Sequence, residues 1–104
     1  MIDQLRAFLK FLRLNRNLSR HTVRAYESDL TQLLAHAAAV AGTGKREVRP
    51  ASLDRAVIRS FLAEGHAQGQ SRATAARKLA ATRTFLRYLR RESLIDDDPG
   101  SLIA

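Results

Sequence analysis

The sequence contains no cysteine, and this absence removes two common ways of stabilising a small domain. Disulfide staples and cysteine-based zinc sites are both excluded, and the absence suits a reducing cytosol. No apolar run approaches the ~18 residues that a membrane span needs. The start, Met1-Ile2-Asp3-Gln4, lacks the basic and apolar stretches of a signal peptide. We therefore expect a cytoplasmic protein without a metal or other cofactor, folded around an ordinary apolar core.

Acidic residues are few relative to basic ones, and this imbalance indicates a polyanionic partner. Ten acidic residues stand against 18 basic residues in the 104-residue chain, so the formal net charge is +8. Fifteen of the basic residues are arginines, whose side chains bind phosphate bidentately and fork onto guanine edges. A GC-rich genome would also favour arginine over lysine, but it does not explain the sign of the net charge. Nucleic acid and an anionic membrane surface are the two candidate partners.

The sequence shows neither the alternating pattern of β-strands nor an internal repeat. Apolar residues instead recur at helical spacing in four segments. They predict helices over residues 2–14, 19–41 and 71–92, and a third helix in the chain that starts after Ser52 or Asp54 and ends near residues 68–69. Ser19 and Ser71 are suitable N-caps, and Gly42 ends the second helix. Residues 42–50 are predicted to form an exposed loop. The fold class is therefore all-α, with two helical hairpins packed together in one domain.

The second and fourth predicted helices each carry a basic face opposite the core. On the second helix this face holds Arg20, His21, Arg24, Ser28 and Thr31, with Glu27 and Asp29 at its two margins. On the fourth helix it holds Arg72, Arg83, Arg87 and Arg90, with Arg77 and Arg91 widening the stripe. Helix N-termini favour phosphate, so the pattern predicts two helices laid on a DNA duplex. The alternative is a solvated basic face with ordinary caps.

Other side chains with chemical potential are interpreted as structural. Tyr26 lies on a core arc, and Tyr88 lies on the margin of its helix, so both are expected to pack rather than react. His36 and His66 are expected to be isolated surface residues, since no metal-ligand spacing surrounds them. The run from His21 to Arg24 spells His-x-x-Arg, but no partner arginine or nucleophile is placed around it.

Two segments resemble the two motifs of the Xer-type tyrosine recombinases. They are residues 18–34 (LSRHTVRAYESDLTQLL) and residues 69–89 (GQSRATAARKLAATRTFLRYL). Residues 94–99 (LIDDDP) are similar to the exit that leads into the catalytic domain of that family. The resemblance covers essentially the whole chain. It implies the N-terminal core-binding domain, a SAM-like four-helix fold whose second and fourth helices cross the major groove of DNA.

The resemblance also implies a set of DNA-binding residues. These are Arg20, His21, Thr22, Arg24 and Ser28 on the second helix, and Arg72, Thr74, Arg77, Lys78 and Arg83 on the fourth. Because Ala75 and Ala76 are small, base readout by the fourth helix is expected to depend mainly on Arg77, while Arg24 meets the phosphate backbone. Lys78 falls on the core-side arc and would reach DNA only by snorkelling.

The family's catalytic groups are expected to lie outside this chain. The resemblance divides it into a core-binding domain over residues 1–95 and the start of a linker over residues 96–104, leading to an absent catalytic domain. This fragment would then be no enzyme itself, and it would be monomeric. The full-length protein would be a tyrosine recombinase that meets other recombinase subunits in a synaptic tetramer on double-stranded DNA.

Several alternatives stay open. A free-standing helical module, such as a protein-interaction domain or a transposase-like adaptor, fits the composition too, although the end just past the Asp-Pro exit favours a domain boundary in a longer protein. A membrane-surface domain is disfavoured because the apolar faces are used by the core. Chromosome dimer resolution is favoured over phage or mobile-element integration by the lack of an extra N-terminal domain. The XerC and XerD branches are not distinguished.

Overall fold

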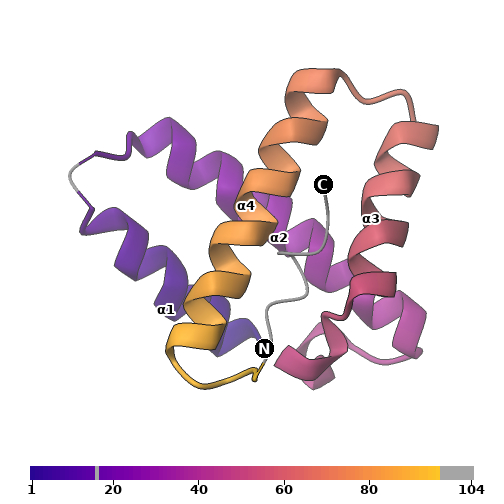
Figure 1. Ribbon diagram of the computed structural model, residues 1–104, viewed down its shortest axis with the longest axis horizontal. Coiled ribbons are helices and arrows are strands. Elements are labelled where there is room, and N and C mark those ends of the chain that lie inside the picture. The colour runs from indigo at the N-terminus through magenta and orange to yellow at the C-terminus, as the bar shows by residue number, and fades with distance from the viewer. Residues whose placement is uncertain (16, 97–104) are drawn as a thin grey trace.

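The computed structural model describes residues 1–15 and 17–96, and its regular elements there are all helical (Figure 1). The four α-helices are α1 (Ile2–Arg13), α2 (Arg20–Ala41), α3 (Arg55–Ala67) and α4 (Arg72–Arg91). Two short 3-10 turns, η1 (Lys45–Glu47) and η2 (Pro50–Ser52), connect α2 to α3. The predicted all-α class is confirmed, and each helix begins and ends within one or two residues of its predicted bounds.

Three helices begin at side chains that cap free backbone N–H groups. Ser19 accepts a hydrogen bond from the Thr22 amide at 3.1 Å, and Ser71 accepts one from the Thr74 amide at 3.1 Å. Asp54 does the same for α3, accepting from the Val57 amide at 2.9 Å. Such caps fix the point at which each helix starts, since the first turn has no other acceptor for these donors.

The interval between α2 and α3 is more than an exposed loop. Gly42 ends α2 with a left-handed φ of 71°, a conformation that glycine adopts without a steric penalty. Beyond it, the predicted loop forms η1 and enters η2, and it contributes one core residue, because Val48 is buried. The sequence pattern missed this anchor because one apolar residue in a polar segment has no periodicity.

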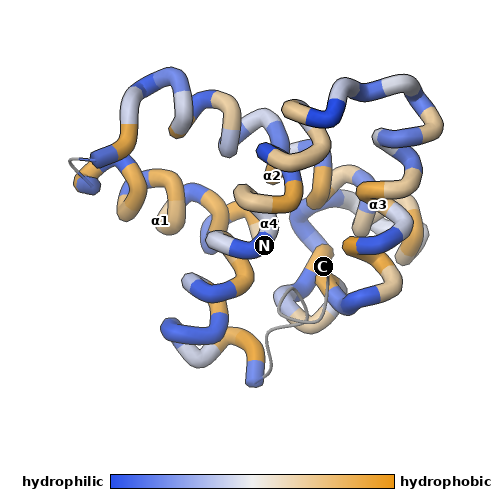
Figure 2. The backbone as a smooth tube through the Cα atoms, turned by 45° about the horizontal axis from the view of Figure 1, so that its top comes forward, coloured by the Kyte–Doolittle hydropathy of each residue, from blue (hydrophilic) through white to orange (hydrophobic). Residues whose placement is uncertain are grey.

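The helices enclose one apolar core, and α2 contacts each of the other three helices. The fully buried large side chains come from every helix and include Phe8, Leu30, Leu33, Leu34, Ile58, Phe85, Leu86 and Leu89. Apolar and polar residues are interspersed along each helix (Figure 2). Tyr26 and Tyr88 pack against this core, as predicted. No helix in the described part of the chain is long and apolar enough to cross a membrane.

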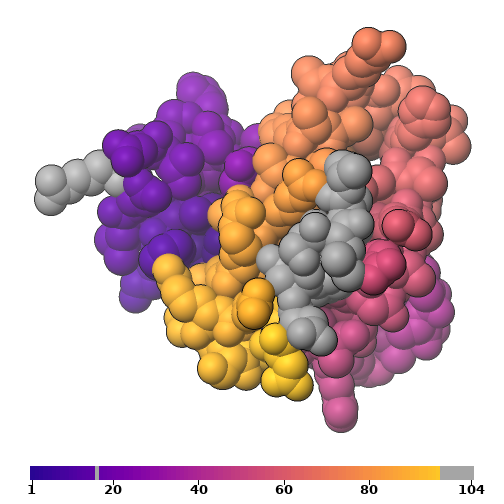
Figure 3. All heavy atoms as spheres, in the orientation of Figure 1, coloured from indigo at the N-terminus to yellow at the C-terminus, as the bar shows by residue number. Residues whose placement is uncertain are grey.

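The most extensive interface between helices is that of α2 with α4, which cross near the middle of the molecule (Figure 1). In that view α1 lies on one side of the crossing and α3 on the other. The space-filling view shows α4 running down the visible face, with α1 and the start of α2 beside it (Figure 3). The two basic helices predicted from the sequence are therefore direct neighbours.

Candidate nucleic-acid interface

The N-terminal ends of α2 and α4 have the same hydroxyl arrangement. Ser19 Oγ lies 3.0 Å from Thr22 Oγ1, and Ser71 Oγ donates to Thr74 Oγ1 at 3.0 Å. Each pair therefore closes one helical turn with a cap and a second hydroxyl group. Because Thr22 and Thr74 are both half-buried, they support the helix ends and leave the neighbouring arginines to face solvent.

Most of the sequence-predicted residues lie on the surface. Exposed are Arg20, His21, Arg24, Ser28, Arg72 and Arg77, whereas Thr22, Thr74 and Arg83 are half-buried and Lys78 is buried. Within the described residues, Arg20, Arg24 and Arg72 form no ion pair with a carboxylate. These three guanidinium groups are therefore available to an external anion.

A depression of about 490 Å³ separates the end of α1 from the start of α2. Arg20 and Arg24 line it together with Arg13. Arg13 Nη2 lies 3.9 Å from Glu27 Oε2. This ion pair is loose and exposed, so it contributes little to stability in water. Three arginines around one shallow depression make the start of α2 strongly cationic.

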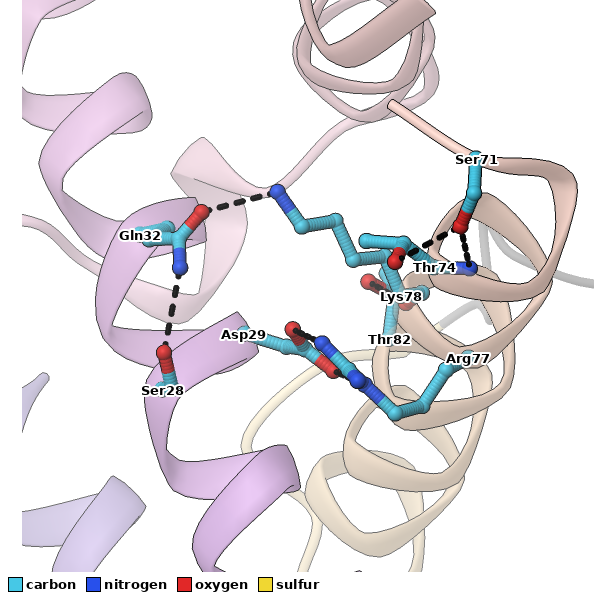
Figure 4. Close-up of polar contacts among 8 residues, drawn as sticks. All are labelled: Ser28, Asp29, Gln32, Ser71, Thr74, Arg77, Lys78 and Thr82. Carbon is cyan, nitrogen blue, oxygen red and sulfur yellow. Dashed lines mark hydrogen bonds and ion pairs between the residues drawn. The ribbon is translucent and has the colours of Figure 1, made fainter.

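The structure places Arg77 in a bidentate ion pair with Asp29 of α2 (Figure 4). Arg77 Nε donates to Asp29 Oδ2 at 2.8 Å, and Nη2 donates to Oδ1 at 2.9 Å. The Asp29 side chain is 1% exposed and that of Arg77 is 44% exposed. The hydrogen bonding of Arg77 to the Asp29 carboxylate, and the negative charge of that carboxylate, raise the pKa of Arg77 above its ordinary value.

The sequence interpretation of Asp29 as a margin residue of the exposed face was wrong, since the side chain is buried. The spacing of residues along this helix did indicate that Asp29 faces the core. Asp29 lies three residues after Tyr26 and four before Leu33, two residues already assigned to the core arc, so it shares their side of the helix. A carboxylate on that arc requires a cationic partner, and Arg77 supplies it.

Lys78 is 5% exposed, and its ammonium group is directed toward α2 (Figure 4). Nζ donates to Gln32 Oε1 at 2.8 Å and lies 5.2 Å from the centre of the Phe61 ring. Gln32 Nε2 in turn donates to Ser28 Oγ at 3.1 Å. Lys78 therefore orients the exposed Ser28 hydroxyl through Gln32, rather than snorkelling to the surface. Gln32 was not among the predicted site residues.

The expectation that His36 stands alone was wrong. His36 Nε2 lies 2.6 Å from Ser60 Oγ, and Nδ1 lies 3.0 Å from Glu64 Oε2. Ser60 and Glu64 are four residues apart on α3, so they lie on the same face of that helix and can each contact one nitrogen of the His36 ring. This contact joins α2 to α3, and the His36 ring also lies 5.7 Å from the Phe61 ring that Lys78 of α4 approaches.

Two crossing helices, each with a hydroxyl cap followed by an exposed arginine, define this chain as a small helical domain with a cationic face. The chain belongs to the phage integrase N-terminal SAM-like domain family, whose model matches residues 5–93. The predicted resemblance and its SAM-like fold class are thereby confirmed.

Curated relatives in several bacteria carry the name tyrosine recombinase XerC. The chain is 41% identical over 92 residues to that of Pelotomaculum thermopropionicum, covering 88% of this chain and 30% of the relative. It is 39% identical over 104 residues to that of Pseudomonas syringae pv. tomato, covering 97% of this chain and 32% of the relative. The chain thus spans about a third of the length of these relatives. No solved structure matches it significantly.

Proposed function

We propose that this chain is the DNA-binding domain of a Xer-type site-specific tyrosine recombinase, and that it grips a duplex with α2 and α4. The observation that carries the proposal is the pair of crossing helices with exposed arginines near their two capped N-termini. These arginines, Arg20, Arg24 and Arg72, pair with no carboxylate in the part of the chain that the structure describes. Membership of the integrase family supports the same conclusion.

In this proposal the surroundings of each residue decide how it contributes to DNA binding. Arg20, Arg24 and Arg72 neutralise phosphates, helped by the free N–H groups at the helix starts. The Ser28 hydroxyl group donates a hydrogen bond to a phosphate oxygen, since its own oxygen already accepts one from Gln32. His21, Thr22, Thr74 and Arg83 flank these contacts. Lys78 contributes from inside the domain by holding Gln32.

The activity of a longer protein is part of the same proposal. The relatives are named recombinases, and two thirds of their length has no counterpart in this chain. We assign the chemistry of strand exchange to that remaining part, with other recombinase subunits as partners in a synaptic tetramer in the cytoplasm. Chromosome dimer resolution is the proposed role, because the relatives that cover nearly all of this chain carry the XerC name.

Titration of the chain with duplex DNA at several salt concentrations tests the DNA-binding proposal. Neutralising about four to six phosphates predicts a log–log slope of affinity against salt near −4 to −5. Affinity that does not change with salt, or no binding at all at low salt, contradicts the proposal. The oligomeric state, measured in the same buffer, is expected to be monomeric without DNA.

A further inference from the structure

We infer that Asp29 is a positioning residue that fixes the guanidinium group of Arg77 so that it reads a base edge instead of a phosphate. The inference rests on the proposed DNA-binding function of α2 and α4. It concerns two residues that touch each other where these helices cross (Figure 4).

The hydrogen bonds leave one edge of the guanidinium group free for a ligand. Asp29 occupies the side formed by Nε and Nη2. A guanidinium group carries five N–H donors, so both donors of Nη1 and the second donor of Nη2 remain. One donor of Nη1 and the remaining donor of Nη2 form a second fork at the tip of the side chain, which is 44% exposed. Such a fork matches the O6 and N7 acceptors of guanine.

The charge of the pair also favours a base over a phosphate. The buried carboxylate of Asp29 cancels the charge of Arg77 at hydrogen-bond distance. Arg24 and Arg72, by contrast, meet no carboxylate among the described residues. A neutral pair gains little from a phosphate anion, whereas the neutral acceptors of a base still accept its hydrogen bonds. Arg77 is therefore assigned to readout, and the unpaired arginines to the backbone.

The restrained conformation of the Arg77 side chain also favours base readout over a phosphate contact. An unrestrained arginine loses rotamer freedom when it docks on a base. Arg77 has already lost that freedom to two bonds with a side chain that is itself 1% exposed. Lys78, the next residue on α4, is also bonded to α2. The position of the free fork is thus fixed relative to both helices that are proposed to meet DNA.

A pool of duplexes with randomised sequence tests the inference without knowledge of the target site. The chain is incubated with the pool, bound duplexes are sequenced, and total binding is measured in parallel. The wild-type chain is expected to enrich guanine at one position by about fivefold to a hundredfold, the range of a bidentate contact. Failure of the chain to bind the pool contradicts the proposed function. Binding without any guanine preference contradicts only the present inference.

Asp29→Asn separates positioning from charge. This variant frees the charge of Arg77, so total binding to the unselected pool is expected to hold or rise while the guanine preference falls at least fivefold. Glu27→Gln is the matched control, since it makes the same charge change on the same helix but frees Arg13. It is expected to keep the preference. Equal loss of preference in both variants, or retained preference in Asp29→Asn, overturns the inference.

Two further variants show that Asp29 acts through Arg77. In an Arg77→Ala background, Asp29→Asn is expected to have no additional effect on base preference, and an additional effect overturns the inference. If the single variants fail to fold, the double variant Asp29→Leu with Arg77→Met replaces the pair by apolar side chains of similar size and leaves the net charge unchanged. It is expected to bind the pool with wild-type affinity and to lose the guanine preference. A retained preference overturns the inference.

Discussion

The two ends of α4 are attached to the rest of the domain by different chemistry. Toward the C-terminal end, Phe85 and Leu89 have no solvent exposure, and the Phe85 ring lies 5.1 Å from that of Phe8 on α1. Toward the N-terminal end, Arg77 and Lys78 are bonded to polar side chains of α2. Apolar packing stabilises one end without specifying a ligand, whereas the polar contacts fix the orientation of side chains that face solvent.

The largest expected effect is at the apolar end of α4. Phe85→Ala is expected to lower the free energy of unfolding by about 2–5 kcal/mol, because it leaves a cavity in a fully buried site. Urea unfolding followed by circular dichroism measures this loss. Leu30→Ala on α2 is the companion variant and is expected to fall in the same range. A loss below about 0.5 kcal/mol at both positions, typical of surface sites, would mean that neither side chain lies in the core.

The next largest effect is expected at the polar end of α4, where loss of Arg77 should cost more stability than loss of the charge on Asp29. Arg77→Ala is expected to cost about 2–3 kcal/mol of stability, because it leaves the buried Asp29 carboxylate without a partner. Asp29→Asn is expected to cost about 1 kcal/mol, since the freed guanidinium group can turn to water. The same unfolding experiment compares the two variants. Equal costs would show that Asp29 reaches solvent once its partner is removed.

Helical periodicity predicted the apolar end of α4 well and the polar end only in part. Phe85, Leu86 and Leu89 lie on one face, so spacing alone identifies them as core. The contact between Asp29 and Arg77 joins residues 48 positions apart in the chain, and a helical wheel does not show which helices cross. His36 and Ser60, 24 positions apart, escaped notice for the same reason.

The basic faces were accessible to sequence reasoning because charge is a property of single residues. Arg20, Arg24 and Arg72 were identified from their position on the wheel, and they are exposed. The roles of Arg77 and Lys78 were not accessible in the same way. Arg77 belongs to the basic stripe by its position, yet it is paired with Asp29. Lys78 was already placed on the core-side arc and is buried there, but its bond to Gln32 of α2 could not be read from the spacing. Only the packing of α4 on α2 shows which basic side chains are available to a ligand and which already have a partner within the domain.

A smaller effect is expected at the first turn of α4. Ser71→Ala removes the cap of the Thr74 amide and is expected to cost about 1 kcal/mol, as N-cap losses commonly do. Ser19→Ala on α2 is a close match, because its bonds to Thr22 have the same lengths. Unfolding of both variants under one set of conditions makes the comparison. Costs that differ widely would show that one of the two helix ends is held by something other than its cap.

The smallest effect on stability, and the clearest one on DNA binding, is expected for Arg24→Ala. Arg24 is exposed on α2 and has no carboxylate partner among the described residues, so the free energy of unfolding should change by less than about 0.5 kcal/mol. Affinity for duplex DNA should fall about equally on all sequences, and the salt slope should become shallower by about one, because one phosphate contact is lost. Arg59→Ala, an exposed arginine on α3, removes the same charge away from the proposed interface and should leave the slope unchanged. If both variants change the slope alike, binding depends on net charge rather than on the face of α2. If Arg24→Ala instead alters sequence preference while the slope stays constant, the division between a backbone-binding α2 and a base-reading Arg77 is reversed.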